Sequence, residues 1–541
     1  MEDRCLTVTE EYALLVDGVI LNKVELFAKT GKDSVPELVG ELVHTLGIQQ
    51  ALACLRGPFS GAVLDRRKRV LYAFANQTGE SAAFSYSWPV GPLLSNGFDL
   101  MMRIARAANL PVTFDEHAAL VMLTYGFMID DHSFAREVTR IGPGAFASFD
   151  LDEGHSVKER YWSLSAGEMC DIRTIDEAVV ELDRLFRRAV ERCFNKDLEY
   201  GYARHLVDLS GGLDARMVNV VARDLGFGAI TNISYSESQS DEHRYTIRLA
   251  AQLGNDCLYH PMDGGRSVLS PEENLRLNSG LAFYSGITGG HFVLRSLNVQ
   301  EFGLEHTGQI GGAVVGTYLT GAARRPPTAG AGAYSHVNNY PAELEEDDAE
   351  IFFMNTRAFR GSTSTHVLRQ HFTYAVSPYS DVELLQFAFS LPLEWRLKHK
   401  LFARWVKNCY PSALAVPTTR FLPLKSSYLR NVALFVRKAV GVLSRRAQGW
   451  LQAKRLHSPR FLARLGYSMN PLESWYANNS DFRSVIDDSR EAARSIDASP
   501  ELAASLDRSF GPKGSMWDKV LGVTVVTMYS MYFGPKSGAA R

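Results

Sequence analysis

Residues 206–216, which read LVDLSGGLDAR, place a serine, two adjacent glycines and an aspartate directly after an apolar run. The run 205–209 is typical of a buried strand, and residues 217–226 have apolar positions at helical spacing that stop at Gly226. The loop between them stands at a helix N-terminus, where free N–H groups and the helix dipole favour an anion. Because glycines let an anion approach the backbone, we predict a phosphate-binding loop here.

The spacing within this loop separates it from two common phosphate loops. It has neither the GxxxxGK[ST] pattern of a Walker loop nor the GxGxxG pattern of a dinucleotide fold. An ordinary strand–turn–helix junction is the alternative to an anion site. Two neighbouring glycines cost conformational entropy, however, which an anion site justifies and a plain turn does not require.

The segments around the loop alternate between helix and strand. An amphipathic helix is predicted over 175–194, a strand over 228–238, a second helix over 240–254 and a further strand over 256–263. This order predicts a parallel sheet wound by helices, with the binding crevice at the carboxyl ends of the strands, where the glycine loop lies. Beyond about residue 270 the chain reads as mostly helical.

The earlier part of the chain is rich in strand signals. Apolar runs flank three polar turns, each of which predicts a hairpin, at residues 17–18, 65–69 and 152–154. Segments 98–110 and 116–128 lie between the second and third hairpins and have helical spacing. A sheet sandwich with small helices attached is therefore predicted for this part.

At 541 residues the chain is too long for one hydrophobic core, so at least two domains are expected. The change from strand-rich to helix-rich sequence falls near residue 165. We predict an α/β protein with an α+β sandwich over 1–165, followed by a doubly wound parallel-sheet domain with a helical C-terminal region over 175–541.

Composition argues against several functional classes. A net charge of −2 and a pI near 6.7 do not suit a nucleic-acid-binding protein. The N-terminus has no apolar signal core, and no window offers the roughly 18 apolar residues of a membrane span, so a cytoplasmic protein without an integral membrane segment is predicted. Six widely spaced cysteines without a CxxC pair suit reduced thiols.

Longer stretches connect the loop to a known family. LSGGLDAR, residues 209–216, resembles the pyrophosphate loop of the ATP-pyrophosphatase ligases in the form used by asparagine synthetases. Residues 15–26 and 55–86 resemble segments of a class II glutamine amidotransferase domain, and 377–411 resembles part of the synthetase domain. The resemblance is densest to asparagine synthetase-related proteins of surface-polysaccharide clusters, and the layout is similar to lasso-peptide macrolactam synthetases.

The resemblance implies an enzyme that adenylates a carboxylate with Mg-ATP, releases pyrophosphate and lets an amine attack the acyl-adenylate. In this reading Ser210, Gly211 and Gly212 hold the pyrophosphate, and Asp214 binds Mg²⁺ through its carboxylate. Arg216 either contacts a phosphate or forms a surface ion pair. The predicted ATP-binding residues are Leu209, Ser210, Gly211, Gly212, Asp214, Arg216, Ile233, Ser234 and Gly308.

The N-terminal part departs from an active glutaminase. Class II glutaminases need a mature N-terminal cysteine whose thiol attacks glutamine. Here Glu2 follows Met1, the nearest cysteine is Cys5, and Ala75-Asn76 replaces an arginine–aspartate pair of the family. We therefore expect a glutaminase-shaped scaffold without glutaminase activity, and a substrate amine or free ammonia as the nucleophile.

The loop and the second motif of the synthetase part also differ from the family. Ala215 replaces a serine found in many relatives. Residues 306–318 resemble the second motif, but Gly312 stands where relatives place a metal-binding acid. Loss of one carboxylate is expected to weaken the metal clamp on the phosphates.

A positive charge is also displaced. The lysine that neutralises pyrophosphate in relatives falls near Thr419 here, so Arg420 or Lys425 is expected to supply that charge from a different position. The predicted catalytic residues are accordingly Asp214, Arg420 and Lys425, with Asp214 as the metal ligand.

Two hypotheses of function follow. The first is a ligase that joins a small-molecule or peptide carboxylate to an amine, and the second is a degenerate paralogue that binds nucleotide or acts as a scaffold. A homodimer and a partner from the same biosynthetic cluster stay open for either. An acid that reaches the loop from Glu305, Asp241 or Glu242 favours the ligase, since metal carboxylates can move in sequence while keeping their place in space.

Several other charged residues receive ordinary interpretations. The basic stretch 437–464 is expected to be a solvated helix face, with an anionic membrane or glycan as the alternative ligand. His205, His260 and His291 have no ligand-like spacing, and core or surface positions are expected for them. His291 and Arg295 follow a glycine-rich turn and are the alternative candidates for binding a substrate carboxylate.

Overall fold

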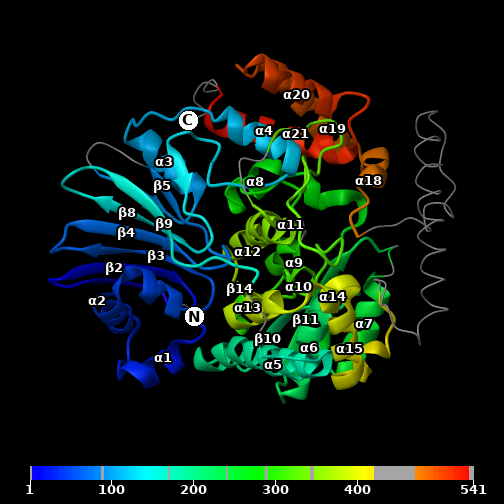
Figure 1. The fold of residues 1–541 in the computed structure, drawn as a ribbon. Helices are drawn as coiled ribbons and strands as arrows, with labels where there is room; N and C mark the ends of the chain where they lie inside the picture. Colours follow the sequence, from blue (N-terminus) through cyan, green and yellow to red (C-terminus); the bar gives the residue numbers. More distant parts are fainter. Residues whose placement is uncertain are drawn as a thin grey trace.

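A computed structural model gives the fold of the 541-residue chain (Figure 1). It describes residues 3–86, 91–167, 171–238, 240, 242–286, 290–341, 346–418 and 469–534. The chain forms an α/β protein, as predicted, with antiparallel sheets first, a parallel sheet in the middle and a helical C-terminal region.

The N-terminal region is built on a six-stranded antiparallel sheet of order β1-β2-β3-β4-β8-β9. Its strands are β1 (Cys5–Val8), β2 (Tyr12–Gly18), β3 (Phe59–Asp65), β4 (Val70–Ala75), β8 (Ala145–Asp150) and β9 (Ser156–Arg160). The predicted hairpins around 65–69 and 152–154 are confirmed, because β3 pairs with β4 and β8 pairs with β9.

The hairpin predicted at Asp17-Gly18 is wrong. Strand β2 continues through Gly18, which pairs with Phe59 of β3, and the hairpin partner of β2 is β1. Gly18 has φ +129°, and a Cβ there would lie 2.2 Å from the carbonyl oxygen of Pro58. The glycine is therefore required by the close approach of two segments of the chain, β2 and the start of β3, and not by a turn.

Small elements cover this sheet and extend from it. A second antiparallel sheet has the order β6-β5-β7. Its strands are β5 (Phe84–Tyr86), β6 (Leu93–Ser95) and β7 (Val138–Arg140), and the helices of the region are α1 (Lys23–Thr30), α2 (Val35–Cys54), α3 (Phe98–Ala107) and α4 (Glu116–Tyr125). Helix α4 begins at the N-cap Asp115, whose carboxylate accepts the His117 and Ala118 N–H groups.

The central sheet is parallel, with the order β12-β11-β10-β13-β14. Helix α5 (Ile175–Glu199) precedes the sheet. The strands are β10 (His205–Asp208), β11 (Ile230–Ser236), β12 (Asp256–Pro261), β13 (Glu305–His306) and β14 (Ala375–Val376), with helix α6 (Asp214–Asp224) between β10 and β11 and helix α7 (Glu242–Leu253) between β11 and β12. All seven residues of β11 are buried, as expected of a strand covered on both faces.

Neighbouring residues of β10 show that both faces of this sheet are packed. Leu206 belongs to a core cluster with the C-terminal helices, whereas Val207 belongs to a second cluster with α5 and α6. Successive strand residues point to opposite faces, so helices cover the sheet on both sides, as the predicted doubly wound arrangement requires.

The rest of the described chain is mainly helical. Its α-helices are α8 (Pro271–Leu277), α9 (His291–Arg295), α10 (Gly311–Val314), α11 (Ala349–Phe353), α12 (Ser364–Arg369), α13 (Val382–Ser390), α14 (Leu393–Arg396), α15 (Lys400–Cys409), α18 (Leu472–Asn478), α19 (Ser480–Ala492), α20 (Pro500–Phe510) and α21 (Met516–Tyr532). A π-helix over Met354–Ser362 joins α11 to α12. None of the helices within the described ranges is both long and apolar enough to cross a membrane.

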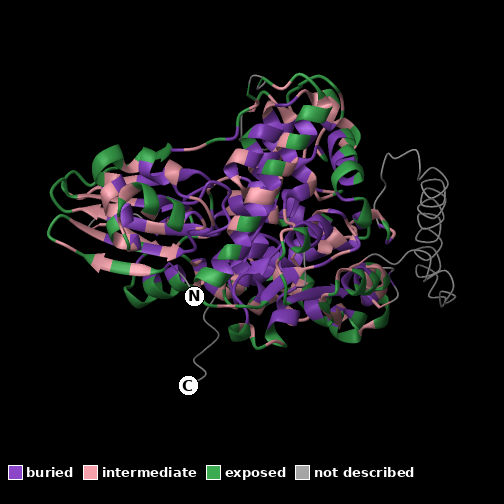
Figure 2. Cartoon of the chain, turned by 90° about the horizontal axis from the view of Figure 1, so that it is seen from below, coloured by how far each residue is buried: buried purple, intermediate pink, exposed green. Residues whose placement is uncertain are grey.

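Packing crosses the division predicted near residue 165. Helix α4 lies against α20 and α21 (Figure 1), and one hydrophobic cluster contains residues of all three. Buried residues gather in the central helical body, whereas the outer strands carry many exposed residues (Figure 2). The two-domain boundary stays a prediction: one core cluster crosses it, whereas the core beneath the six-stranded sheet is a separate cluster.

Candidate functional site

The glycine loop lies where the sequence predicted it, between β10 and α6 at the carboxyl end of the central sheet. Leu209 is buried, and its N–H donates to the Ile233 carbonyl of β11 at 2.9 Å. The Gly212 N–H donates to Ser210 Oγ at 3.3 Å, which closes the turn. Ile233 and Ser234 are buried in the adjacent strand β11.

A carboxylate accepts a hydrogen bond from the backbone of this loop. The Gly211 N–H donates to Glu242 Oε1 at 2.8 Å, and Glu242 is the first residue of α7. A carboxylate oxygen and a phosphate oxygen are alike in charge and in accepting N–H hydrogen bonds. The loop therefore presents an N–H group to an anion, which is the property that its glycines predicted.

Asp214 opens helix α6 beside a second turn of the chain. A Cβ placed on Gly311 would lie 2.9 Å from the Cβ of Asp214 and 2.8 Å from the Tyr379 ring. The Tyr379 hydroxyl donates to the Asp214 carbonyl at 3.3 Å. Burial raises the pKa of Tyr379 well above its usual range, and the Asp214 charge adds to that shift, so the phenol stays protonated and able to donate.

The turn before Gly311 packs directly on the loop. A Cβ on Gly308 would lie 2.4 Å from the backbone nitrogen of Ala215. Ile310, at φ +56°, adopts the left-handed conformation that non-glycine residues seldom take. The motif over 306–318 therefore meets the glycine loop in space, and Gly312 brings no carboxylate to that meeting point.

Glu305, one of the acids considered as a metal ligand, is engaged elsewhere. Arg369 donates from Nη1 to Glu305 Oε1 at 2.5 Å and to Asp208 Oδ2 at 2.9 Å, and from Nη2 to the Tyr235 hydroxyl at 2.9 Å. We call these four residues the Arg369 cluster. Arg369, Glu305 and Tyr235 are buried and Asp208 is partly buried; the cluster lies on α12, at the carboxyl ends of β10 and β11 and on β13, next to the glycine loop.

The charges of the Arg369 cluster do not balance if both carboxyls are ionised. Burial raises the pKa of Glu305 well above its usual range, with Asp208 acting in the same direction and Arg369 against it. Among the described residues, Glu305 Oε2 and Asp208 Oδ1 have no hydrogen-bond partner. Sequence reasoning missed Arg369, since it lies far along the chain and no motif marks it.

Arg216 ties the loop to a distant segment. Its guanidinium is fully buried and donates to the carbonyl oxygens of Ala413, Val416 and Pro417 at 2.8, 2.6 and 2.9 Å. The predicted alternative of a surface ion pair is wrong, because an arginine inside helix α6 faces the core here. Its contact with a phosphate stays a prediction.

His291 and Arg295 share the short helix α9 but face different surroundings. His291 is buried, and neither ring nitrogen has a partner among the described residues. Burial lowers the pKa of His291 to about 4, and Arg295 adds to that effect. Arg295 forms an ion pair with Glu273, so its guanidinium already holds a carboxylate of the same chain.

Cys5 lies half-buried in β1, within a hollow of about 530 Å³. Burial raises the pKa of its thiol, which lowers the fraction of reactive thiolate. The polar side chains of the hollow bind one another: Arg4 Nε and Asn96 Nδ2 donate to Asp17 at 2.5 and 2.6 Å. The absence of glutaminase activity stays a prediction.

Several predicted residues fall outside the described ranges. They are Asp241, Thr419, Arg420, Lys425 and the basic stretch 437–464. Of the three acids proposed to reach the loop, Glu242 does so and Glu305 is held by Arg369. His205 is buried at the start of β10, and His260 lies on β12.

Comparison with known proteins places few limits on the function. No family model and no curated protein matches the chain, while 27 solved chains match. One is an allosteric regulatory enzyme of purine biosynthesis, 10% identical, covering 47% of this chain and 62% of its own, with a TM-score of 0.22. Another is glutamine phosphoribosylpyrophosphate amidotransferase from B. subtilis complexed with ADP and GMP, 12% identical, covering 71% and 74%, also with a TM-score of 0.22.

The chain thus spans less than two thirds of the first of these structures. At such identities and TM-scores neither similarity carries an argument about activity. The chemistry of the glycine loop and its neighbours has to be judged from the geometry of this chain.

Proposed function

We propose that the chain is an ATP-dependent amide-forming ligase that adenylates a carboxylate, releases pyrophosphate and transfers the acyl group to an amine or to ammonia. The observation that carries the proposal is the Gly211 N–H bound to the Glu242 carboxylate at 2.8 Å. It supports an anion-binding role for a glycine loop at a helix N-terminus and at the carboxyl end of a parallel sheet.

The residues around the loop fit Mg-ATP by their donor chemistry. Backbone N–H groups and the hydroxyl of Ser210–Gly212 suit the pyrophosphate oxygens, and the carboxylate of Asp214 suits a hard divalent cation. Ile233 and Ser234, which lie buried inside the neighbouring strand β11, are expected to contact the base. Nucleotide entry at Gly211 requires the Glu242 carboxylate to leave that N–H, or to turn toward the metal.

A second candidate function is nucleotide binding without catalysis. Gly312 supplies no carboxylate beside Gly311 and Asp214, and Glu305 is engaged by Arg369. A metal clamp short of one acid holds the phosphates less firmly, and electrostatic stabilisation of that kind is a large contribution to phosphoryl chemistry. In this second candidate function the glycine loop still binds the nucleotide phosphates, but the chain does not catalyse adenylation.

Calorimetric titration with ATP, in the presence and absence of Mg²⁺, tests the nucleotide site. We expect Mg²⁺-dependent binding by the natural chain, weakened at least about tenfold, or about 1.4 kcal/mol, by Asp214→Ala because the metal loses its carboxylate. Asp224→Ala is the matched control, since Asp224 closes the same helix at its other end. Absence of ATP binding by the natural chain contradicts both candidate functions.

Release of pyrophosphate separates the two candidates. The natural chain is incubated with Mg-ATP and a panel of amino, sugar and peptide acids, and pyrophosphate is measured with Asp214→Ala as the blank. Acid-dependent release supports the ligase. Tight Mg-ATP binding without release across the panel supports the non-catalytic nucleotide-binding protein.

A further inference from the structure

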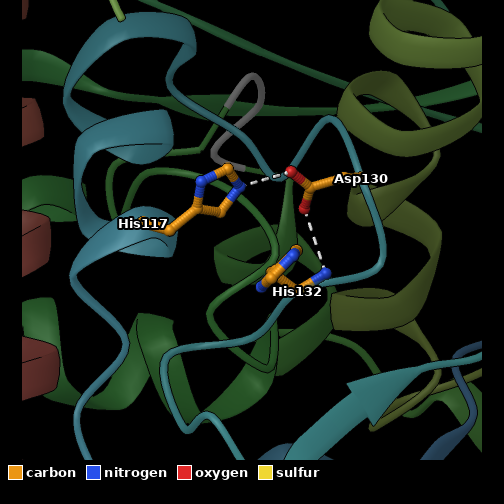
Figure 3. A group of neighbouring side chains, drawn as sticks. All are labelled: His117, Asp130 and His132. Carbon is orange, nitrogen blue, oxygen red and sulfur yellow. Dashed lines mark hydrogen bonds and ion pairs between the residues drawn. The ribbon is translucent and has the colours of Figure 1, made fainter. Parts of the chain in front are cut away.

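Two histidines and an aspartate meet at the start of α4, far along the chain from the glycine loop. His117 lies in the first turn of α4, and Asp130 and His132 lie in the segment that follows this helix. Their side chains turn toward one another (Figure 3), and one ligand atom from each lies within 4.8 Å of the other two. We call these three residues the His117 group.

The separations inside the His117 group are close to those of a metal centre. His117 Nε2 and Asp130 Oδ2 are 2.9 Å apart, and the two imidazole rings have centroids 4.3 Å apart. Metal bonds of about 2.0–2.1 Å at a tetrahedral angle put neighbouring ligand atoms roughly 3.3 Å apart. An opening of a few tenths of an ångström therefore brings His117 Nε2 and Asp130 Oδ2 onto one ion, and His132 has to approach from within 4.8 Å.

The outer nitrogens of both rings are held by oxygen atoms. His132 Nδ1 lies 3.0 Å from Asp115 Oδ2, and His117 Nδ1 lies 3.2 Å from the Tyr340 hydroxyl. In metal proteins a ligating histidine usually engages its second ring nitrogen with a carboxylate or another oxygen, which fixes the tautomer. Here that arrangement leaves Nε2 of His117 2.9 Å from Asp130 Oδ2, and one ring nitrogen of His132 lies within 4.8 Å of both ligand atoms.

Burial is graded across the group, so that an ion can enter. The Asp130 and His117 side chains are 13% and 15% exposed, whereas the His132 side chain is 46% exposed. The Asp130 side chain is also fixed by the backbone of His132, whose N–H donates to Asp130 Oδ1 at 3.0 Å. A rigid, mostly buried carboxylate and a histidine open to solvent make an accessible site.

Two other groups of similar composition lack these properties. In the first, His205 and His306 both contact the same oxygen of Asp197, whose other oxygen accepts the Leu304 N–H, and the three side chains are at most 2% exposed. That carboxylate is fully used inside the core.

The second group, Asp150, Glu153 and His155, lies at the exposed hairpin turn between β8 and β9. Asp150 Oδ1 accepts the N–H groups of Asp152 and Glu153, at 2.9 and 2.8 Å, which accounts for its place in the turn. It serves as the control for a histidine and acids that gather without building a site.

We propose that the His117 group binds one divalent first-row transition ion, Zn²⁺ above all, through Nε2 of His117, Nε2 of His132 and the carboxylate of Asp130. Two imidazoles and one carboxylate are the donor set that Zn²⁺ accepts in proteins with one position left for a further ligand, and Mg²⁺ prefers oxygen alone. The bound ion joins the start of α4 to the segment that follows the same helix.

The full-length natural chain is tested by removing metal with a chelator, titrating Zn²⁺, and measuring bound zinc by mass spectrometry after gel filtration. We expect about one Zn²⁺ per chain, and Co²⁺ in its place is expected to give the visible absorption of a low-symmetry nitrogen and oxygen site. The variant His117→Ala/His132→Ala is expected to retain none, whereas His155→Ala retains the full amount. Mg²⁺ in excess does not displace Zn²⁺.

Folding of the variants is checked separately, because His117 opens a buried helix. His132→Gln alone changes a half-exposed side chain, and Tyr340→Phe removes only the hydroxyl beside His117; we expect zinc affinity to fall at least about tenfold in each while circular dichroism is unchanged. The proposal is overturned if the natural chain retains no zinc. It is equally overturned if both folded variants bind zinc as tightly as the natural chain, which places the ion elsewhere.

Discussion

Among single residues, His291 shows how burial without a partner fixes a charge state. The ring is 3% exposed, neither nitrogen has a partner among the described residues, and Arg295 lies on the same short helix. Burial therefore lowers the pKa of His291 from 6.5 to about 4. The native chain keeps this ring neutral at pH values where the unfolded chain protonates it.

This difference makes stability depend on pH with a definite sign. Between pH 6.5 and about 4 the unfolded state binds one more proton at this site, so the free energy of unfolding falls as the pH falls through that window. From pH 7 to pH 5 the contribution of His291 is about 2 kcal/mol. We expect His291→Phe to reduce the pH 7-to-5 loss by that amount in denaturant unfolding, since Phe loses no hydrogen bond.

The control for this prediction is an exposed histidine. The His155 side chain is 56% exposed on the β8–β9 turn. His155→Phe is expected to leave the pH dependence within a few tenths of a kcal/mol of the natural chain. Equal pH slopes for His291→Phe and the natural chain would show that His291 takes up its proton at the same pH in the folded and unfolded states.

Among elements, the turn between β13 and α10 decides how the second motif meets the glycine loop. Gly308 packs on the first turn of α6, where a Cβ would lie 2.4 and 2.7 Å from the nitrogen and Cα of Ala215. Backbone atoms cannot rotate away as a side chain can, so the two elements have to separate. We expect Gly308→Ala to destabilise the fold by about 1–3 kcal/mol, measured by denaturant unfolding.

A second glycine provides the matched comparison. A Cβ on Gly321 would meet nothing within 4 Å, so Gly321→Ala is expected to leave stability within about 0.5 kcal/mol of the natural chain. A loss of stability of similar size in both variants would show that the packing of Gly308 on α6 is not its cause, since the lower entropy of the unfolded chain after a Gly→Ala change by itself stabilises the fold. Loss of Mg-ATP binding in Gly308→Ala alone would further link the turn to the proposed nucleotide site.

The sequence predicted those elements in which local pattern and tertiary packing agree. The β10–loop–α6 unit follows from an apolar run, two glycines and helical spacing, and the β3–β4 hairpin follows from its polar turn. The prediction of a hairpin at Asp17-Gly18 was wrong because the same dipeptide occurs both in tight turns and where two segments of a chain approach closely. Only the neighbouring Pro58, which follows a long helix, distinguishes the two cases.

The polar surroundings of the site were beyond sequence reasoning for a different reason. The Arg369 cluster joins four elements through side chains, and each member alone looks like an ordinary helix or strand residue. For Arg216 the sequence left open a phosphate contact or a surface ion pair, and the residue is buried because backbone carbonyls beyond α15 satisfy its guanidinium. Such pairings depend on the assembled fold and leave no periodic trace in the sequence.

At the scale of the whole molecule, buried and partly buried polar contacts join the N-terminal sheets to the later chain. Glu80 accepts from the Ser380 hydroxyl at 2.8 Å and contacts His366 Nδ1 at 3.0 Å, and Arg56 pairs with Glu383 at 2.9 Å. Charged groups at such a junction are desolvated, so each depends on its partner. Removal of one charged partner at this junction is therefore expected to lower the free energy of unfolding more than loss of a surface ion pair.

The ion pair between Asp3 and Lys196 gives the strongest test of that expectation. Their charged atoms lie 2.8 Å apart, and the side chains are 1% and 0% exposed. Lys196→Met leaves the Asp3 carboxylate buried with Lys23 alone as a cation, so we expect a loss of about 3 kcal/mol in denaturant unfolding. Asp152→Ala, which removes a pair with both side chains 58% exposed, is expected to cost under about 1 kcal/mol.

The double variant Asp3→Leu/Lys196→Met should cost less than the two single changes added together, because it leaves no unpaired charge at the junction. Strict additivity would mean that the pair contributes no coupling energy to the contact between the N-terminal region and α5.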